Sequence, residues 1–258
     1  MQRAVVLTIA NQKGGVGKTT TAVSVGAALA RAGKRVLLLD LDPHANASIH
    51  LRIYPEETPY TMYDVFMAQN PESPALWRQV RIEHETAGFD VVPGSVRLAE
   101  LEIDLRERPG KGALLRTALE AVRQEYDYIV LDCPPHVGIL LVNALVAADW
   151  LIIPIQTDFL ALHGLKLLFD TIGVLNKVLP APVRYRVLPT LYDKRAGACS
   201  RVLELLSRKM GHSMFTTTIG MDTRFREASA HGRVIYEIAP NSRGAKQYEA
   251  LAQEIMAL

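Results

Sequence analysis

A glycine-rich stretch that ends in a lysine and two threonines has the composition of a phosphate-binding loop. Residues 13–20 read KGGVGKTT and lie between an apolar run, Val5–Ile9, and a segment of helical period, Thr19–Ala32. Glycines let backbone N–H groups close around a phosphate, and the N-terminus of the following helix adds partial positive charge. Lys18 would then reach the β and γ phosphates of a nucleotide, and the Thr19 hydroxyl would bind Mg²⁺. The candidate nucleotide-binding residues here are Gly14, Gly15, Val16, Gly17, Lys18, Thr19 and Thr20.

The loop departs from the common pattern at one position. A strict G-x-x-x-x-G-K-[ST] motif has glycine where this chain has Gln12, so Gly14 and Gly15 must supply the turn. A glycine-rich turn without a ligand is the alternative interpretation. The apolar run before the loop, the helical segment after it and the Lys18–Thr19 pair favour a variant P-loop that binds ATP and Mg²⁺.

Carboxylates stand where two further apolar runs end. Asp40 and Asp42 follow Val36–Leu39, and Asp132 follows Tyr128–Leu131. The carboxyl ends of parallel strands meet at the sheet edge where nucleotides bind. We therefore expect Asp132 to support the magnesium ion and Asp42 or Asp40 to orient the attacking water. A single aspartate at a strand end can equally cap a helix, but three at one edge favour a metal site. The candidate metal-binding residues are Thr19, Asp40 and Asp132.

The order of apolar segments predicts the fold that positions these residues. Runs of strand length alternate with longer segments of helical period, which is typical of βαβ units. We expect one α/β domain over residues 1–258, with a doubly wound, mostly parallel sheet and helices on both faces. The predicted strands are Val5–Ile9, Val36–Leu39, Phe89–Val92, Tyr128–Leu131, Leu151–Pro154 and Tyr185–Leu188. The predicted helices are Thr19–Ala32, Met62–Ala68, Gly112–Gln124, Leu160–Val178, Ser200–Met210 and Gly244–Leu258, with residues 50–88 otherwise irregular.

Composition excludes several other classes of protein. The two cysteines, Cys133 and Cys199, have no metal-ligand spacing, which argues against a zinc site or a disulfide framework. The opening apolar run is short and predicts a buried strand rather than a secretory signal. The nearest approach to a membrane span, residues 139–155, is interrupted by Asp149 and Pro154.

Basic residues concentrate in one part of the chain. The net charge is only +2, but residues 194–246 hold ten Lys or Arg against four Asp or Glu. Such asymmetry favours a surface that binds a polyanion, with a solvated basic face as the plain alternative. The candidate DNA-binding residues are Arg201, Arg208 and Lys209 on a predicted helix, Arg224, Arg226 and Arg233 on a predicted loop, and Arg243 and Lys246 at the start of the last helix.

Together these motifs resemble the ParA/MinD family of ATPases, and more closely its ParA branch. The loop is similar to the family's deviant Walker A motif, in which the additional lysine, here Lys13, reaches across a dimer to the partner's nucleotide. The resemblance is to the short form, without the helix-turn-helix extension of longer plasmid members. The residues that carry it outside the loop are Asp40 and Asp42, Asp132–Gly138, Ile155 and Gln156, Ala161–Leu165, Pro240–Ala245 and Tyr248.

The resemblance implies a function as well as a fold. It implies a homodimer when ATP is bound, nonspecific DNA binding, slow hydrolysis stimulated by a ParB-like activating partner, and a cytoplasmic, nucleoid-associated protein that does not bind membranes. It implies Lys13, Lys18, Asp40 and Asp42 as the catalytic residues. Pro189 and Thr190, after the last predicted strand, are further candidate nucleotide contacts.

Two departures from the family's pattern concern the cargo and the base. Residues 42–46 read DPHAN where the family often has Asp-Pro-Gln-Gly-Asn, and residues 219–222 read IGMD where Ile-Pro-x-Asn is common. The first departure leaves the cargo open and the second leaves the adenine contacts open. Beside the positioning ATPase, two other functions remain as alternatives: a MinD-like membrane-associated regulator, and an ATP-dependent synthetase of the same superfamily. The final helix argues against the first, because its polar face carries more acidic than basic residues. The length argues against the second, since 258 residues leave no room for a further substrate domain.

Overall fold

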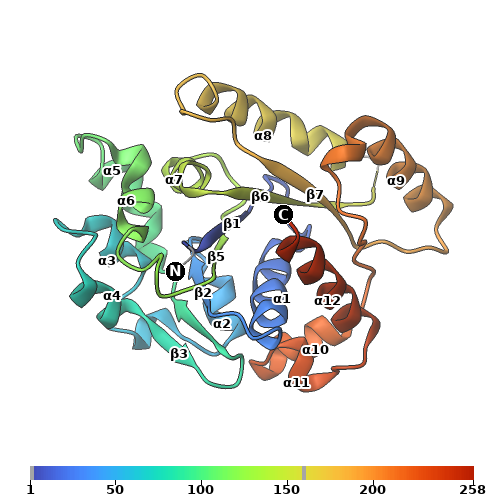
Figure 1. Cartoon of the computed structure of the whole chain (residues 1–258), viewed down its shortest axis with the longest axis horizontal. Coiled ribbons are helices and arrows are strands. Elements are labelled where there is room, and N and C mark those ends of the chain that lie inside the picture. The colour runs from blue at the N-terminus through green and yellow to red at the C-terminus, as the bar shows by residue number, and fades with distance from the viewer. Residues whose placement is uncertain (1–2, 159–160) are drawn as a thin grey trace.

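In the computed structural model, which describes residues 3–158 and 161–258, one seven-stranded sheet runs through the molecule (Figure 1). The strands lie in the order β3-β4-β2-β5-β1-β6-β7. Neighbouring strands are parallel except β3, which is antiparallel to β4. The sheet consists of β1 (Val5–Ile9), β2 (Val36–Asp40), β3 (Ile82–His84), β4 (Phe89–Val92), β5 (Tyr128–Asp132), β6 (Trp150–Gln156) and β7 (Tyr185–Thr190).

The central strands are apolar along their whole length because helices cover both faces of the sheet. Every residue of β2 and β5 is buried. Alternate side chains enter opposite cores, so that Val6 of β1 packs in one hydrophobic cluster and Leu7 in the other. The register places Asp40 of β2 opposite Asp132 of β5, which aligns the carboxyl ends of the two strands at one edge.

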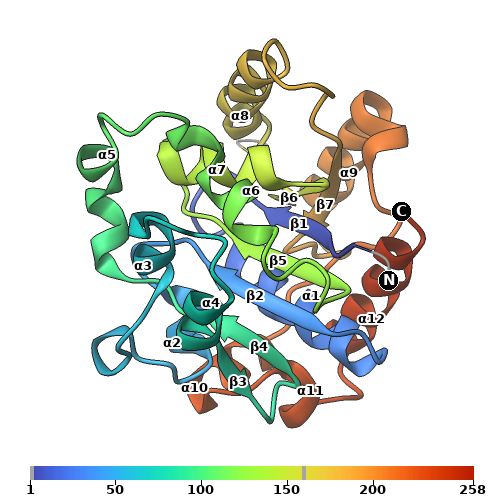
Figure 2. The same ribbon diagram turned by 60° about the vertical axis from the view of Figure 1, so that its left-hand side comes forward.

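The first helix and the last helix cover one face of the sheet together. Tyr248 of the last helix is buried and shares a hydrogen bond of 3.0 Å with Thr21 of the first. An apolar stripe on the last helix, Tyr248, Leu251, Ala252 and Ile255, is buried in one cluster with residues of the first helix. The elements on this face are α1 (Lys18–Arg31), α2 (Asn46–His50), α10 (Arg224–His231), α11 (Ile235–Ile238) and α12 (Arg243–Met256) (Figure 2).

The remaining helices contribute to the hydrophobic cluster on the opposite face. Short 3-10 turns at 55–57, 96–100, 111–113 and 211–213 connect some of these elements. The helices are α3 (Met62–Met67), α4 (Pro74–Val80), α5 (Leu101–Asp104), α6 (Leu114–Leu119), α7 (Ile139–Ala147), α8 (Ala161–Leu175) and α9 (Gly197–Met210). None of the helices in the described part of the chain is both long and apolar enough to cross a membrane.

The predicted sheet is confirmed, and the corrections concern elements around it. All six predicted strands are present, whereas β3 and α4 lie in residues 50–88, which were expected to be irregular apart from one helix. The helix predicted over Gly112–Gln124 spans only Leu114–Leu119, since 3-10 hydrogen bonds such as Glu120 N to Thr117 O replace the helical pattern. Leu160, the expected first residue of α8, lies outside the described residues.

Among the helices that the sequence analysis missed, α7 and α10 have signals that differ from amphipathic periodicity. α7 is apolar on almost every side, so its sequence shows no helical stripe. α10 replaces the loop on which Arg224 and Arg226 were expected. The Asp222 carboxylate accepts a hydrogen bond of 3.0 Å from the Arg224 N–H, and Gly232 ends the helix in a left-handed conformation with φ of 66°.

Candidate nucleotide site

The glycine loop joins β1 to α1 with an open space above its backbone. Gly15 and Gly17 have φ of 72° and 88°, in the left-handed region that disfavours other residues. A methyl group placed on Gly14, Gly15 or Gly17 would meet no atom within 4 Å. The loop therefore leaves room for a phosphate at the N-terminus of a 14-residue helix.

Lys18 is buried at the base of this loop. Its Nζ donates a hydrogen bond of 3.1 Å to the carbonyl oxygen of Lys13, across the loop. Burial lowers the pKa of Lys18, and the negative charges of Asp132 and Asp42 oppose that shift. The ammonium group is thus held where phosphate oxygens would complete its coordination.

Asp132 shows most clearly that the acidic cluster is suited to a cation. It is fully buried, and neither of its carboxylate oxygens has a hydrogen-bond partner of good geometry among the described residues. Burial and the nearby charge of Asp40 raise the pKa of Asp132 well above its ordinary value, while Thr19 and Lys18 act to lower it. A buried carboxylate in this state is stabilised by a cation or its bound water, so the donor set fits Mg²⁺.

Asp40 is tied to α2 instead. Its Oδ2 accepts hydrogen bonds from the Ser48 backbone N–H at 2.9 Å and the Ser48 hydroxyl at 2.7 Å. Burial raises the pKa of Asp40 to about 6, against the lowering effect of these bonds. Gly94 makes this packing possible, because a methyl group there would lie 2.9 Å from the Asp42 carbonyl oxygen. The sequence analysis identified neither Ser48 nor Gly94, which belong to other segments.

Asp42 lies at the rim of the acidic cluster. Its side chain is buried, and its Oδ1 accepts a hydrogen bond of 2.9 Å from the His44 N–H. Ala45, where the family's pattern has glycine, adopts a left-handed conformation with φ of 49°. That conformation costs a non-glycine residue about 1–2 kcal/mol, so the backbone turn is kept although the glycine is absent.

Lys13 is directed away from the phosphate space. Its Nζ lies 2.7 Å from Oδ2 of Asp158, just after β6, and its side chain is 28% exposed. The Asn11 side chain fixes the start of the turn by accepting a hydrogen bond of 3.0 Å from the Lys13 N–H. The two lysines of the loop therefore occupy different environments, Lys18 inside the loop and Lys13 at its rim.

A small cavity of about 130 Å³ beside the loop is suited to a base. Gly17 and Thr20 line it together with Ile219, Gly220, Phe225 and Tyr248. Thr190 also lines it, but its hydroxyl donates to the Val16 carbonyl at 2.8 Å and so supports the loop. The carbonyl of Pro189 accepts a bond of 2.9 Å from the Ile219 N–H, so Pro189 positions the 219–222 segment. Phe225 and Tyr248 had no local sequence signal for this role.

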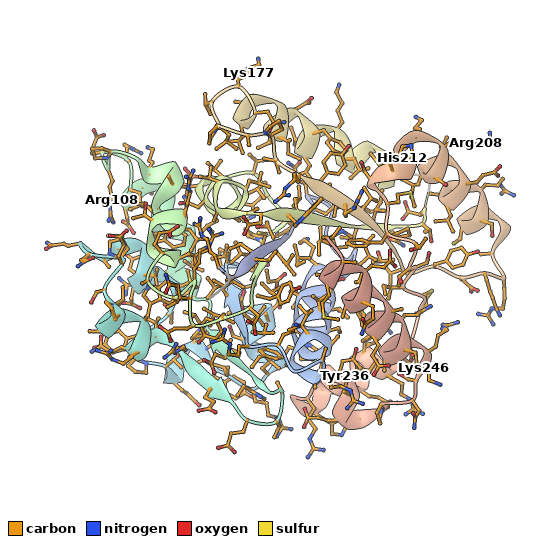
Figure 3. The ribbon with its side chains drawn as sticks, in the orientation of Figure 1. Arg108, Lys177, Arg208, His212, Tyr236 and Lys246 are labelled. Carbon is orange, nitrogen blue, oxygen red and sulfur yellow. The ribbon has the colours of Figure 1, made fainter. Side chains whose placement is uncertain are left out.

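The candidate DNA-binding residues are exposed but do not form one stripe. Figures 1 and 2 both show α9 well apart from α10. In Figure 3, Arg208 of α9 and Lys246 of α12 extend outward at different places on the same side of the molecule. Ion pairs of 2.5 Å join Arg208 to Glu204 and Arg224 to Glu227.

Two of these residues line a cavity together with one lysine and one arginine that were not among the candidate DNA-binding residues. A cavity of about 560 Å³, the basic cavity below, is lined by Lys194, Arg195, Arg226 and Arg243. Asp193 pairs with Arg195 at 2.9 Å and offsets part of this charge. Arg226 and Arg243 are thus the members of the candidate set that line the basic cavity, while Arg243 and Lys246 line a second cavity beside it.

Comparisons with known proteins agree with this geometry. A parallel sheet with a glycine loop and buried carboxylates at its carboxyl edge defines a P-loop nucleotide-binding protein. The chain matches, over residues 4–183, the model of a family described as an AAA domain. It is 39% identical over 253 residues to the sporulation initiation inhibitor protein Soj of Bacillus subtilis, and the match covers 98% of each chain.

Two further similarities point to the same group. The chain is 38% identical over 257 residues to the chromosome partitioning protein ParA of Caulobacter vibrioides, covering 97% of this chain and 93% of that one. Cobyrinic acid a,c-diamide synthase from Mycobacterium smegmatis, solved with an ATP analog and magnesium, superposes with a TM-score of 0.84 at 30% identity, covering 98% and 94%. The chain belongs to the ParA/MinD family of P-loop ATPases.

Proposed function

We propose that this chain is an ATP-dependent dimerising ATPase that partitions or positions a chromosome, plasmid or other large assembly with the help of a partner protein. The observation that carries the proposal is the second lysine of the loop. Lys13 lies at the rim and pairs with Asp158, whereas Lys18 is buried within its own loop. A lysine that is not needed for phosphate binding in its own subunit is available to a nucleotide in another.

ATP and Mg²⁺ are the ligands that the site fits best. The glycine loop and Lys18 would hold the phosphates, while Thr19 and Asp132 would hold the magnesium ion directly or through water. The ion would supply charge stabilisation for phosphoryl transfer. The unpartnered oxygens of Asp132 support this assignment from the protein side.

The remaining polar residues divide the catalytic work. Asp42, at the rim of the cluster, would orient the attacking water, because its carboxylate is held by the His44 N–H next to the phosphate loop. Asp40 keeps α2 against the site through Ser48. Lys13 would complete the site of the opposite subunit, which makes hydrolysis depend on dimerisation.

DNA would bind to the basic surface around Arg226 and Arg243. Binding would be nonspecific because phosphate contacts carry no sequence information. A dimer would present two such surfaces and so bind more tightly than a monomer, which would link ATP to nucleoid association. A ParB-like protein, the partner that the family resemblance implies, would stimulate hydrolysis and release the dimer.

Replacing Lys18 tests the site on which the proposal depends. Lys18→Ala should lose measurable ATP binding in a calorimetric titration, because several phosphate charges would then lack their buried cation. Lys177→Ala is the matched control, because Lys177 follows α8, is exposed and extends outward at the top of Figure 3, so this variant should bind ATP like the parent. Equal ATP affinity in the Lys18→Ala variant would exclude this site.

The ATP-dependent synthetase is the second candidate, because cobyrinic acid a,c-diamide synthase matches nearly the whole chain at 30% identity. A synthetase consumes ATP only with its carboxylate substrate present. ATP hydrolysis by the purified chain with DNA and no such substrate would favour the positioning ATPase. The MinD-like alternative is disfavoured by α12, whose apolar stripe is buried on the sheet side of the helix.

A further inference from the structure

A second cluster of arginines lies at the edge of the sheet opposite the nucleotide site. β1 begins there at Val5 and reaches the glycine loop after Ile9, so the two sites lie roughly 15 Å apart along the strand. A cavity of about 240 Å³ opens at this edge. Four arginines line it and define the arginine cavity: Arg3, Arg116, Arg123 and Arg184.

Arg123 lies at the bottom of the arginine cavity and is only partly satisfied. Its side chain is 6% exposed, and its Nη2 donates to Asp149 Oδ2 at 3.0 Å. Its buried Nε has no hydrogen-bond partner in the part of the chain that the structure describes. Burial lowers the pKa of Arg123, and the positive charges of Arg3 and Arg116 add to the effect. A buried guanidinium N–H without a hydrogen-bond acceptor is destabilising, and a bound anion would supply that acceptor.

The other three arginines have guanidinium N–H groups that are not used in hydrogen bonds. Arg184 donates through Nε to the Asp149 carbonyl at 3.2 Å and lies over the Trp150 ring at 4.7 Å, which orients its outer edge. Arg116 makes no hydrogen bond or ion pair within residues 3–158 and 161–258. Arg3 pairs with Glu120.

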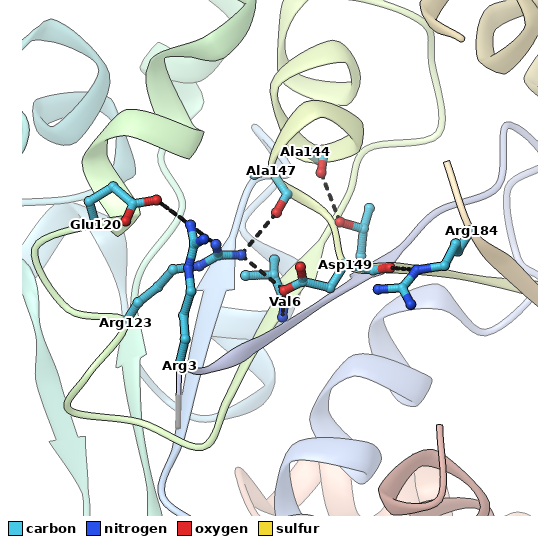
Figure 4. Close-up of polar contacts among 9 residues, drawn as sticks. Arg3, Val6, Glu120, Arg123, Ala144, Ala147, Asp149 and Arg184 are labelled. Atoms are coloured by element: carbon cyan, nitrogen blue, oxygen red, sulfur yellow. Dashed lines mark hydrogen bonds and ion pairs between the residues drawn. The ribbon is translucent and has the colours of Figure 1, made fainter. Parts of the chain in front are cut away.

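Two carboxylates are too few for this set, and one of them is already engaged. Asp149 Oδ2 accepts from the Val6 N–H at 2.8 Å as well as from Arg123. Figure 4 shows Asp149 between Arg123 on one side and Arg184 on the other. Among the described residues, the ion pairs of the four arginines involve only Asp149 and Glu120, so positive charge is in excess at the cavity.

We propose that the arginine cavity binds a small phosphorylated anion, of the size of phosphate or pyrophosphate. Guanidinium groups match phosphate oxygens with paired hydrogen bonds, and converging arginines are the usual protein device for this chemistry. The cavity is smaller than the 300–1,000 Å³ or so of typical drug-sized sites, which suits a compact anion. This site is independent of the nucleotide function proposed above, because it shares no residue with the glycine loop.

Calorimetric titration with pyrophosphate tests the proposal on the full chain. Lys18→Ala, in buffer without Mg²⁺, provides a background in which the glycine loop does not compete. We expect binding of one pyrophosphate per chain and a rise in melting temperature on its addition. Adding Arg116→Ala and Arg184→Ala to this background should weaken binding at least about tenfold, because each removes a charge-assisted bond. Both side chains are exposed, so circular dichroism should show an intact fold.

Arg186→Ala, on β7 two residues after Arg184, is the matched control. Arg186 also lies over Trp150, at 5.4 Å, but does not line the cavity, so this variant should bind pyrophosphate like the background. Absence of binding by the background, or equal binding by the double variant, would overturn the proposal. One further result would overturn it. If the background bound a short DNA duplex, lost that binding in the double variant and did not bind pyrophosphate, the arginines would contact a nucleic-acid backbone instead.

Discussion

The ammonium nitrogen of Lys13 lies 2.7 Å from a carboxylate oxygen of Asp158, within one subunit. A lysine that acts on the nucleotide of another subunit must leave this partner first. In the dimer proposed above, breaking this pair would cost each subunit the free energy of a partly exposed ion pair, which is up to about 1 kcal/mol. The free energy of ATP binding would have to offset that cost.

The first prediction follows from this pair. Asp158→Asn should strengthen ATP-dependent dimerisation by up to about thirtyfold, because it removes up to about 1 kcal/mol of restraint on Lys13 in each of the two subunits. Sedimentation equilibrium with a slowly hydrolysed ATP analogue measures the effect. Lys13→Ala is the control and should lose partner-stimulated hydrolysis. Unchanged or weaker dimerisation of Asp158→Asn would show that the pair does not restrain the lysine.

The second prediction separates binding from hydrolysis. Asp42→Ala should bind ATP with nearly the parent affinity but hydrolyse it at least about a hundredfold more slowly, because the attacking water loses its orienting carboxylate. Dimer should then accumulate, which light scattering detects at saturating ATP. A monomeric Asp42→Ala protein under those conditions would contradict the assigned role.

The third prediction concerns pH and Asp40. Its pKa is about 6 in the folded state and 3.8 ordinarily, so between these values the folded state holds a proton that the unfolded state has lost. The free energy of unfolding therefore falls as pH rises from about 4 to about 6, by roughly 2–3 kcal/mol from this group. Denaturant titrations without nucleotide should show this fall in the parent relative to Asp40→Asn. Parallel curves for the two proteins would mean that Asp40 ionises normally.

The fourth prediction compares two basic surfaces. Arg224→Glu with Arg226→Glu should reduce retention of ATP-bound protein on DNA at least about tenfold, because Arg226 lines the basic cavity. Dimerisation should persist. Arg201→Glu with Arg208→Glu on α9 changes charge equally and should have the smaller effect. A larger loss of DNA retention in the α9 variant would place the DNA-binding surface on α9. If the ATP-bound parent is not retained on DNA at low salt, the chain has no nucleic-acid function.

Local motifs explain why the phosphate site could be predicted from the sequence. The glycine loop and the aspartates after β2 and β5 each lie within a few residues of a strand, so alternation of strands and helices was enough to bring them to one edge. The contacts that refine the site are nonlocal. Thr190 supports Val16 from 174 residues away, and Ser48 reaches Gly94 across 46. The spacing of apolar residues along the sequence gives no information about contacts between residues so far apart.

The misplaced helix has a different physical cause. Residues 224–231 carry little apolar periodicity, and only the capping residues Asp222 and Gly232 mark the ends of α10. The candidate DNA-binding residues were consequently assigned to one surface from charge counts alone. Tertiary packing decides which charged residues share a surface, and it brings Arg226 to Arg243 rather than to Arg208.

The hydrogen bond between Thr21 and Tyr248 spans 227 residues and has a consequence for biosynthesis. α1, which begins at the phosphate loop, packs against α12, and Tyr248 also lines the cavity beside Gly17. A nascent chain that has not yet emerged as far as residue 256 lacks this support, and closure of so long a loop is slow. Competence to bind ATP should therefore arise only after α12 has left the ribosome, which would keep unfinished chains out of the dimers proposed above.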